Sequence, residues 1–221
     1  MHMFDYVFDS HDIYLKARQK PFVVGGGAVF WAAKRIFDIT VSLMLLPLVA
    51  IFAAILLIIN PLWNAGPLFY VQTRMGRHCR PFRTVKFRTM QSVTTILRGP
   101  EDPVEAHRIT RLGRLLRLSR IDELPQILNV LKGEMSLIGP RPDYFEHARS
   151  YLASVPGYRE RHVVRPGISG LAQVAVGYVA SSEGTKSKTR ADLYYIENAG
   201  FALDTRLALQ TIYTIFAYRG A

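Results

Sequence analysis

Two adjacent carboxylates, Asp122 and Glu123, are the side chains of this sequence best suited to do chemistry. Neighbouring side chains on a helix point about 100° apart, so these acids do not share one proton and can address two different targets. Pro125 suits the first turn of a following helix, which places both acids near a helix N-terminus, where N–H groups favour anions. The acids therefore indicate either a site for a phosphate-bearing substrate or, more simply, charges that complement a helix dipole.

Several cations would assist such a site, because a carboxylate that faces a phosphate group needs neutralising charge. Arg117 and Arg120 precede the acids, and a divalent cation would add to their effect. Lys86 and Arg88 occupy alternate positions of an expected strand and would point the same way. The turn Gly139-Pro140-Arg141-Pro142 holds one arginine rigidly, which suits phosphate recognition.

The charge of the chain is strongly positive and unevenly placed. The 221 residues carry a formal net charge of +11, and the stretch from Gln72 to Arg120 holds twelve Arg or Lys against three acids. Such a surface suits nucleic acid, anionic lipid headgroups or a charged small substrate, although it also suits a plain solvated face. The single cysteine, Cys79, excludes an internal disulfide and offers no metal-ligand spacing.

An apolar run from Ile39 to Ile59 is the second prominent feature of the sequence. Its 21 residues carry no charge. At ~1.5 Å per residue they extend roughly 30 Å, enough to cross a hydrocarbon core. The run predicts a membrane segment rather than a signal peptide, because it begins far from Met1 and no small-residue cleavage site follows it.

Two observations argue against a simple membrane span. Pro47 lies near the middle of the run and predicts a kink, since proline removes a backbone hydrogen bond. Lys34 and Arg35 precede the run and further arginines follow it, whereas positive charge marks the cytoplasmic side. A helix that breaks at Pro47 and leaves by the face it entered satisfies both observations. The alternatives are a kinked spanning helix and a buried helix of a soluble core.

The rest of the chain divides into short elements between glycine and proline breaks. Residues 1–33 read as an N-terminal extension, and Gly66-Pro67 ends the membrane section. Strands are expected over 68–71 and 82–87, with a loop over 92–105. Helices are expected from about 107, and over 126–132, 191–198 and 204–216.

The helix that begins near His107 combines an apolar face with an arginine at every third position. Because a three-residue spacing drifts about 60° per step on an α-helix, the arginines wrap around the helix rather than stack. Such a helix lies either in the membrane interface, with leucines towards lipid, or on a soluble core with a solvated basic back.

Taken together, these motifs resemble the bacterial sugar transferase family, the monotopic phosphoglycosyl transferases that start exopolysaccharide and glycoconjugate assembly. The resemblance extends over roughly 34–216, and its parts follow the family's order. They are Lys34-Arg35-x-x-Asp38, the apolar run broken by proline, Lys86-Phe87-Arg88-Thr89-Met90, Arg120-Ile121-Asp122-Glu123-Leu124-Pro125-Gln126, Gly133-Glu134-Met135-Ser136-Leu137-Ile138-Gly139-Pro140-Arg141-Pro142 and Arg165-Pro166-Gly167-Ile168-Ser169-Gly170. One departure is Leu46, where some relatives carry a serine directly before the breaking proline.

The resemblance implies a ping-pong reaction between a UDP-sugar and undecaprenyl phosphate. Asp122 would attack the β-phosphate, release UMP and form a phosphosugar-aspartyl intermediate, which undecaprenyl phosphate would convert to undecaprenyl-diphospho-sugar. Glu123 would bind Mg²⁺. Phosphates would be held by Lys86, Arg88, Arg141 and Arg165. The transferred sugar is expected to be a hexose such as galactose or glucose.

The expected fold is α+β and helix-dominated, with a re-entrant membrane helix broken at Pro47, interfacial amphipathic helices and a small sheet. Its parts are the extension 1–33, the membrane helix 34–65 and a catalytic domain 66–221 that faces the cytoplasm. The resemblance implies a monotopic protein on the cytoplasmic face of the bacterial inner membrane, in contact with its lipid and without a nucleic-acid partner. An apolar face on the last helix permits a homodimer.

Two other functions fit parts of the pattern. A membrane-tethered protein that binds nucleic acid or anionic lipid through the arginine helix would show steep salt dependence and be indifferent to Asp122 and Mg²⁺. A non-catalytic assembly partner of a polysaccharide complex would release no UMP even with every substrate supplied.

The re-entrant topology predicts that both ends of Ile39–Ile59 lie on the cytoplasmic side of the membrane. A membrane-impermeant label should therefore reach residues at either end from the cytoplasm only. Labelling of one end from the opposite side would establish a spanning helix instead.

Overall fold

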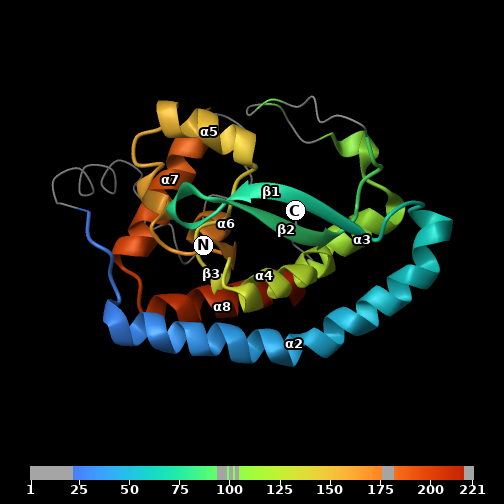
Figure 1. Cartoon of the computed structure of the whole chain (residues 1–221), viewed down its shortest axis with the longest axis horizontal. Coiled ribbons are helices and arrows are strands. Elements are labelled where there is room, and N and C mark those ends of the chain that lie inside the picture. Colours follow the sequence, from blue (N-terminus) through green and yellow to red (C-terminus); the bar gives the residue numbers. More distant parts are fainter. Residues whose placement is uncertain (1–21, 94–98, 100–101, 103–104, 176–181, 217–221) are drawn as a thin grey trace.

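The computed structural model describes residues 22–93, 99, 102, 105–175 and 182–216, and these form the helix-dominated α+β fold expected from the sequence (Figure 1). Most of the expected loop 92–105 lies outside the described residues. The α-helices are α2 (Gly27–Trp63), α3 (Arg111–Leu118), α4 (Ile127–Lys132), α5 (Phe145–Ser154), α6 (Leu171–Ala175), α7 (Ser182–Glu197) and α8 (Phe201–Phe216). The strands are β1 (Phe69–Met75), β2 (Pro81–Phe87), β3 (Ser136–Ile138) and β4 (Gly167–Ser169).

The long apolar helix α2 is one continuous element. It begins after the conformationally free Gly25-Gly26 pair, earlier than the boundary at Lys34, and it contains both Pro47 and Pro61. Figure 1 shows α2 running along one edge of the molecule and bending in its second half. The helix therefore continues through Pro47, since loss of one backbone hydrogen bond distorts a helix without having to end it.

One narrow stripe of α2 packs against the domain along its whole length. The buried residues of the helix are Phe30, Lys34, Asp38, Ser42, Val49, Leu56 and Asn60. Of the most apolar window of the helix, only 17% is buried, and large side chains such as Phe37, Met44 and Ile58 are exposed. A core helix of a soluble protein would bury such side chains, so that alternative does not describe α2.

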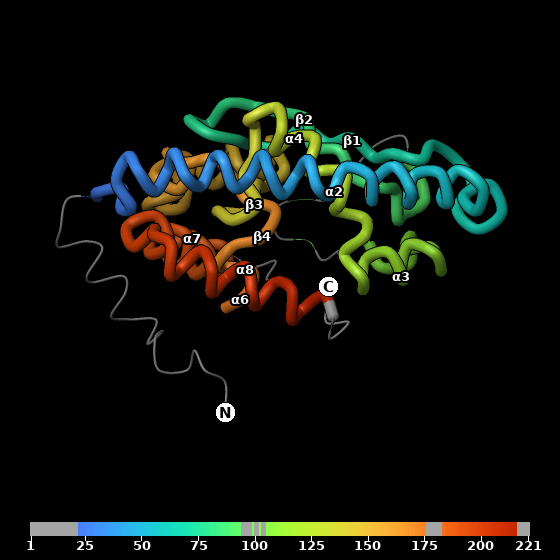
Figure 2. The backbone as a smooth tube through the Cα atoms, turned by 90° about the horizontal axis from the view of Figure 1, so that it is seen from below, coloured from blue at the N-terminus to red at the C-terminus, as the bar shows by residue number. Residues whose placement is uncertain are grey.

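The two cations near the start of α2 bind groups of the domain in addition to preceding the apolar run. Lys34 Nζ lies 2.5 Å from Asp204 Oδ2 on α8. Arg35 donates to the carbonyls of Val130 and Leu131 at the C-terminal end of α4, at 2.7 and 3.1 Å. A buried ammonium needs a counter-ion and helix C-termini attract cations, so both charges hold α2 to the domain. In the view of Figure 2, α2 runs lengthwise across the molecule, with the β1–β2 hairpin above it and α8 below it.

The two expected strands are confirmed as the antiparallel β1–β2 hairpin. The register pairs Tyr70 with Lys86 and Gln72 with Thr84, so alternate residues of both strands share one face. β2 packs on the turn that carries the acids, which is a 3₁₀ segment, η3 (Ile121–Gln126). The hairpin therefore presents the face with Lys86 to the acids.

A second small sheet places the turn around Arg141. β3 and β4 pair in parallel, with Ser136 opposite Gly167. A Cβ on Gly167 would lie 2.2 Å from the Gly139 nitrogen, so only glycine permits the two segments to approach this closely. The close approach brings the turn after β3 beside the start of β4.

The arginine-rich helix α3 packs mainly on the core. Leu112 and Leu116 are buried in one apolar cluster with Leu56 of α2 and Phe87 of β2, whereas Leu115 is 62% exposed. The interpretation as a core helix with a basic back therefore accounts for most of its leucines. Leu115 is the leucine of α3 that remains available for contact with lipid or another apolar surface.

Arg88 holds the end of α2 against the hairpin. Its guanidinium donates to the side-chain oxygen of Asn64 at 3.1 Å, to the backbone carbonyl of Asn64, to the Pro67 carbonyl at 2.7 Å and to the Met90 carbonyl at 3.2 Å. Asn64 in turn donates to the Arg88 carbonyl at 2.8 Å. Arg88 is thereby occupied by protein groups, and its contacts are structural.

Arg88→Met should therefore lower the free energy of unfolding by about 3 kcal/mol, because buried carbonyls lose a charged donor. Arg83→Met in the preceding strand β2 is the matched control, since Arg83 is exposed and its loss should change stability by less than about 0.5 kcal/mol. Thermal or denaturant unfolding in detergent measures both variants. Equal stabilities would contradict a structural role for Arg88.

Candidate active site

The two acids are held in a tight 3₁₀ turn rather than in a regular α-helix. Arg120 precedes η3 with φ 58° and ψ 11°, a left-handed conformation that a residue with a side chain adopts only under constraint. Asp122 and Glu123 occupy the first turn of η3, and α4 follows directly at Ile127. The acids thus lie near a helical N-terminus, as the position of Pro125 indicates.

Glu123 lies at the centre of a buried ion-pair cluster. Its Oε1 atom accepts from Lys86 Nζ at 2.5 Å and from Arg141 Nη2, and its Oε2 atom accepts from Arg141 Nη1 at 3.2 Å. Arg120 Nη1 lies 3.8 Å from Oε2. Glu123 is only 6% exposed, so these contacts are shielded from water and unusually strong.

Asp122 has a different environment from its neighbour. The carboxylate is 8% exposed, and its Oδ1 atom is buried without a hydrogen-bond partner among the described residues. A buried polar atom without a partner is costly, and such atoms are a recurrent feature of functional sites. The two acids therefore address different targets, as their adjacency on a helical segment predicts.

The electrostatics of the two carboxyl groups diverge accordingly. Burial, followed by the charge of Glu123, raises the pKa of Asp122 to about 6. Burial alone would also raise the pKa of Glu123, but Arg141 and Lys86 outweigh it and hold that pKa well below its usual value. Burial lowers the pKa of Lys86 to about 8. At neutral pH, Glu123 is a fixed anion and Asp122 is the carboxylate that can change state.

The structure brings together only two of the four cations that the sequence assigns to phosphate. Lys86 from β2 and Arg141 from the turn after β3 both meet Glu123. Arg88 is used at the end of α2, so Lys86 and Arg88 do not point to a common target. Arg165 donates from Nε to the Gly133 carbonyl at 2.9 Å, beside Arg35 at the end of α4. Arg88 and Arg165 form no ion pair with Asp122 or Glu123 in the described structure, and their guanidinium groups donate to backbone carbonyls instead.

Two arginines near the site were not singled out by the sequence motifs. Arg161 donates to the Arg141 carbonyl at 2.8 Å and is neutralised by Asp143 and Asp192. Arg74 donates to the Pro142 carbonyl at 2.6 Å. Arg74 and Gln72 are alternate residues of β1 and lie on the same face as Lys86, so extension of the strand pattern to Arg74 could have identified it. Arg161 lies in a short 3₁₀ segment, and no sequence pattern identifies it.

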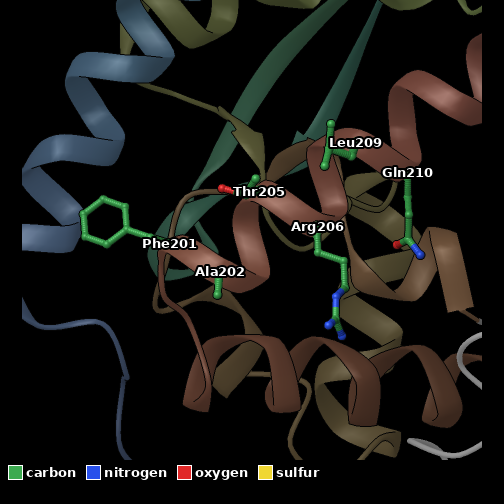
Figure 3. Close-up of a pocket in the computed structure, with 6 residues that line it drawn as sticks. All are labelled: Phe201, Ala202, Thr205, Arg206, Leu209 and Gln210. Carbon is green, nitrogen blue, oxygen red and sulfur yellow. The ribbon is translucent and has the colours of Figure 1, made fainter.

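A shallow hollow on the outer surface of α8 is separate from this cluster (Figure 3). It is lined by Phe201, Ala202, Thr205, Arg206, Leu209 and Gln210, which all belong to one helix. Phe201 also meets the Phe30 ring of α2 edge to face, with the ring centroids 5.3 Å apart. The hollow is therefore part of the apolar surface formed by α2 and α8 and contributes no group to the carboxylate site.

Comparison with known families settles what kind of protein carries this site. The family model of the bacterial sugar transferases matches residues 29–218. The chain belongs to the bacterial sugar transferase family. The family is membrane-associated, and α2 is long and apolar enough to cross a membrane.

Individual relatives agree with this assignment. A UDP-N-acetylgalactosamine-undecaprenyl-phosphate N-acetylgalactosaminephosphotransferase of Aeromonas hydrophila is 41% identical over 85% of this chain and 44% of its own length. The exopolysaccharide production protein PSS of Rhizobium leguminosarum bv. phaseoli is 37% identical over 81% of this chain and 92% of its own. A UDP-glucose:undecaprenyl-phosphate glucose-1-phosphate transferase of Caulobacter vibrioides is 38% identical over 81% of this chain and 68% of its own length. The sugars in these names differ, so similarity alone does not select one for this chain.

A magnesium ion at the acids of this sugar transferase would need further ligands from substrate or water. Mg²⁺ is commonly held by one or two carboxylates together with substrate phosphates and water. Asp122 offers a carboxylate oxygen without a hydrogen-bond partner among the described residues, and Glu123 Oε2 accepts one hydrogen bond there whereas Oε1 accepts two. Among the described residues, no group of three or more His, Cys, Asp or Glu could enclose a metal by itself.

The rate of sugar transfer should depend on pH through these two shifted groups. The ionised Asp122 carboxylate is lost as the pH falls through about 6, and the Lys86 charge is lost as the pH rises through about 8. A profile of kcat/KM against pH should therefore be bell-shaped with limbs near these values. Lys86→Arg, which cannot deprotonate in this range, should shift only the alkaline limb. An acid limb near pH 4 would contradict a buried Asp122.

Proposed function

We propose that this chain transfers a sugar 1-phosphate from a UDP-sugar to undecaprenyl phosphate, forming undecaprenyl-diphospho-sugar and UMP. The observation that carries the proposal is Asp122, a buried carboxylate. One of its oxygens lacks a hydrogen-bond partner in the described part of the chain, and the adjacent carboxylate is neutralised by Lys86 and Arg141. Membership of the sugar transferase family and the printed activities of the relatives support the choice of substrates.

Asp122 is the proposed nucleophile, and the reaction has two displacements. In the first, an Asp122 oxygen forms a bond to the β-phosphorus, the bond from that phosphorus to the bridging oxygen breaks, and UMP leaves with the electron pair. In the second, a phosphate oxygen of undecaprenyl phosphate attacks the same phosphorus and the Asp122 carboxylate is released. The raised pKa of Asp122 fits this role, because a more basic carboxylate is a better nucleophile while it remains ionised at neutral pH.

The neighbouring groups have distinct proposed roles. Glu123 and Asp122 would hold Mg²⁺, which when bound neutralises phosphate charge. Lys86 and Arg141 keep Glu123 ionised and present positive charge to the phosphates beside Asp122. The prolines on both sides of Arg141 restrict its backbone, so its guanidinium is held before the substrate arrives.

We place the chain on the cytoplasmic face of the bacterial inner membrane, with α2 entering and leaving the lipid by that face. Support comes from the two ends of α2, which contact the same domain: Lys34 pairs with Asp204, and Asn64 binds Arg88. A helix that crossed the membrane would put one of its ends in the opposite compartment. The bend of α2 and its exposed apolar surface agree with a helix seated in one leaflet.

Asp122→Asn tests the proposal, because the amide cannot form the covalent intermediate. With undecaprenyl phosphate and Mg²⁺ supplied, a screen of UDP-sugars should give UMP release for the unchanged chain, and the variant should lose at least about 10³-fold in kcat. A radiolabelled phosphosugar adduct should form on the unchanged chain and be absent from the variant. Arg83→Gln, on the opposite face of β2, should retain full activity. Undiminished turnover by Asp122→Asn would refute the proposed nucleophile.

A further inference from the structure

Arg74 shares a strand face with the ion-pair cluster. Tyr70, Gln72 and Arg74 alternate along β1, and the register places Tyr70 opposite Lys86 and Gln72 opposite Thr84. The side chain of Lys86 on this face reaches Glu123. The Arg74 guanidinium donates from Nη1 to the Pro142 carbonyl, next to Arg141, the other cation on Glu123. Arg74 therefore lies between the strand that bears Lys86 and the turn that bears Arg141.

Arg74 forms no ion pair with a carboxylate of the described residues, although the charges of Glu123 and Asp143 act on it from a longer distance. Among the described residues, no Asp or Glu oxygen lies within 4.0 Å of its nitrogens, whereas Lys86 and Arg141 each pair with Glu123. Burial, followed by the charge of Arg141, lowers the pKa of Arg74 to about 10, so it remains a cation at neutral pH. A half-buried cation without a counter-ion is unfavourable unless an anion completes its environment.

The guanidinium is oriented and still has donors to spare. Its Nε and Nη2 atoms donate to Gln72 Oε1 at 3.2 and 3.0 Å, and its Nη1 atom donates to Pro142. A guanidinium carries five N–H groups, and these three hydrogen bonds leave two of them for a ligand. Gln72 is uncharged, so it fixes the direction of Arg74 without cancelling its charge.

The contrast with Arg161 separates this role from a purely structural one. Arg161 also holds the turn, through the Arg141 carbonyl, but Asp143 and Asp192 surround it and it is 3% exposed. The charge of Arg161 is therefore neutralised by protein carboxylates. Arg74 binds the adjacent carbonyl of the same turn and keeps its charge available.

We propose that Arg74 is a substrate-binding residue, which donates to a phosphate oxygen beside Asp122 while Gln72 holds its guanidinium in place. This inference rests on the proposed function, because it assumes that a phosphate-bearing substrate occupies the site. The phosphate belongs either to the UDP-sugar or to the polyprenyl acceptor. Both present the same oxyanion chemistry, for which arginine is the preferred partner.

Two pairs of variants test the proposal. Arg74→Gln removes the charge, and its control Arg83→Gln removes an exposed charge on the other face of the same hairpin. Gln72→Glu leaves Arg74 in place but supplies the missing counter-ion, and its control Thr73→Glu adds the same charge to the opposite face of β1. Gln72→Glu should fold even where Arg74→Gln does not, because the new ion pair replaces an existing hydrogen bond.

Calorimetric titration with UDP and with inorganic pyrophosphate measures binding of the nucleotide phosphates, which is the nucleotide arm of the test. Arg74→Gln and Gln72→Glu should each weaken binding about tenfold or more, with little change for either control. The specificity constant for undecaprenyl phosphate, obtained separately in ping-pong kinetics, measures the acceptor arm. A loss confined to one arm identifies whose phosphate Arg74 contacts.

Unchanged binding and unchanged specificity constants for both substrates in the folded Gln72→Glu variant would overturn the proposal and leave Arg74 as a support for the turn. Failure of the proposed function looks different from this result. In that case the unchanged chain would bind pyrophosphate through Arg74 yet release no UMP from any UDP-sugar.

Discussion

The arrangement of the site depends on one buried carboxylate, Glu123, and the two cations that neutralise it. Lys86 comes from β2 and Arg141 from the turn after β3, so the ion pairs join three segments that are far apart in the sequence. Burying such charges is favourable only when each has a partner and good hydrogen bonds. Because Glu123 has both, the 3₁₀ turn η3 is held in place, and the neighbouring Asp122 is held where its Oδ1 atom has no hydrogen-bond partner among the described residues. The contacts of Glu123 thus fix the position of the acid that we propose as the nucleophile.

Positive charge is abundant in this chain, and burial and partners decide what each cation does. Arg35, Arg88 and Arg165 donate to backbone carbonyls, where they fix α2 and the end of α4. Arg161 is enclosed by two aspartates. Arg74, like the first three, forms no ion pair with a carboxylate of the described residues, but it lies on the strand face of Lys86 and beside the turn that carries Arg141. Of the cations that give the chain its net charge of +11, several therefore hold segments of the protein together, and only a few lie where a ligand could meet them.

The membrane helix and the carboxylate site are parts of one packed unit. Val49 and Leu56 of α2 share an apolar cluster with Phe87 at the end of β2 and with Ile127 at the start of α4. The same two elements carry or border the residues around Glu123. Since the other surface of α2 is apolar and exposed, lipid that covers it would lie directly behind the site. This geometry suits a reaction whose acceptor has its reactive phosphate at the headgroup level.

Local chemistry could be predicted from the sequence because it depends on neighbours along the chain. The apolar run required a long helix, alternation and a turn predicted the β1–β2 hairpin, and Pro125 placed Asp122 and Glu123 at a helical start. The ordered motifs identified the family. The partner of each cation could not be predicted, because hydrogen bonds between distant segments depend on how those segments pack. Lys86 and Arg88 alternate along the chain, yet only Lys86 reaches Glu123, whereas Arg88 donates to the Asn64 carbonyl at the end of α2. Residue types and spacing thus determined which charged groups were present. Tertiary packing decided which of these charges were neutralised and which were left for a ligand. The reason is that a side chain is buried and gains a counter-ion only when distant segments meet.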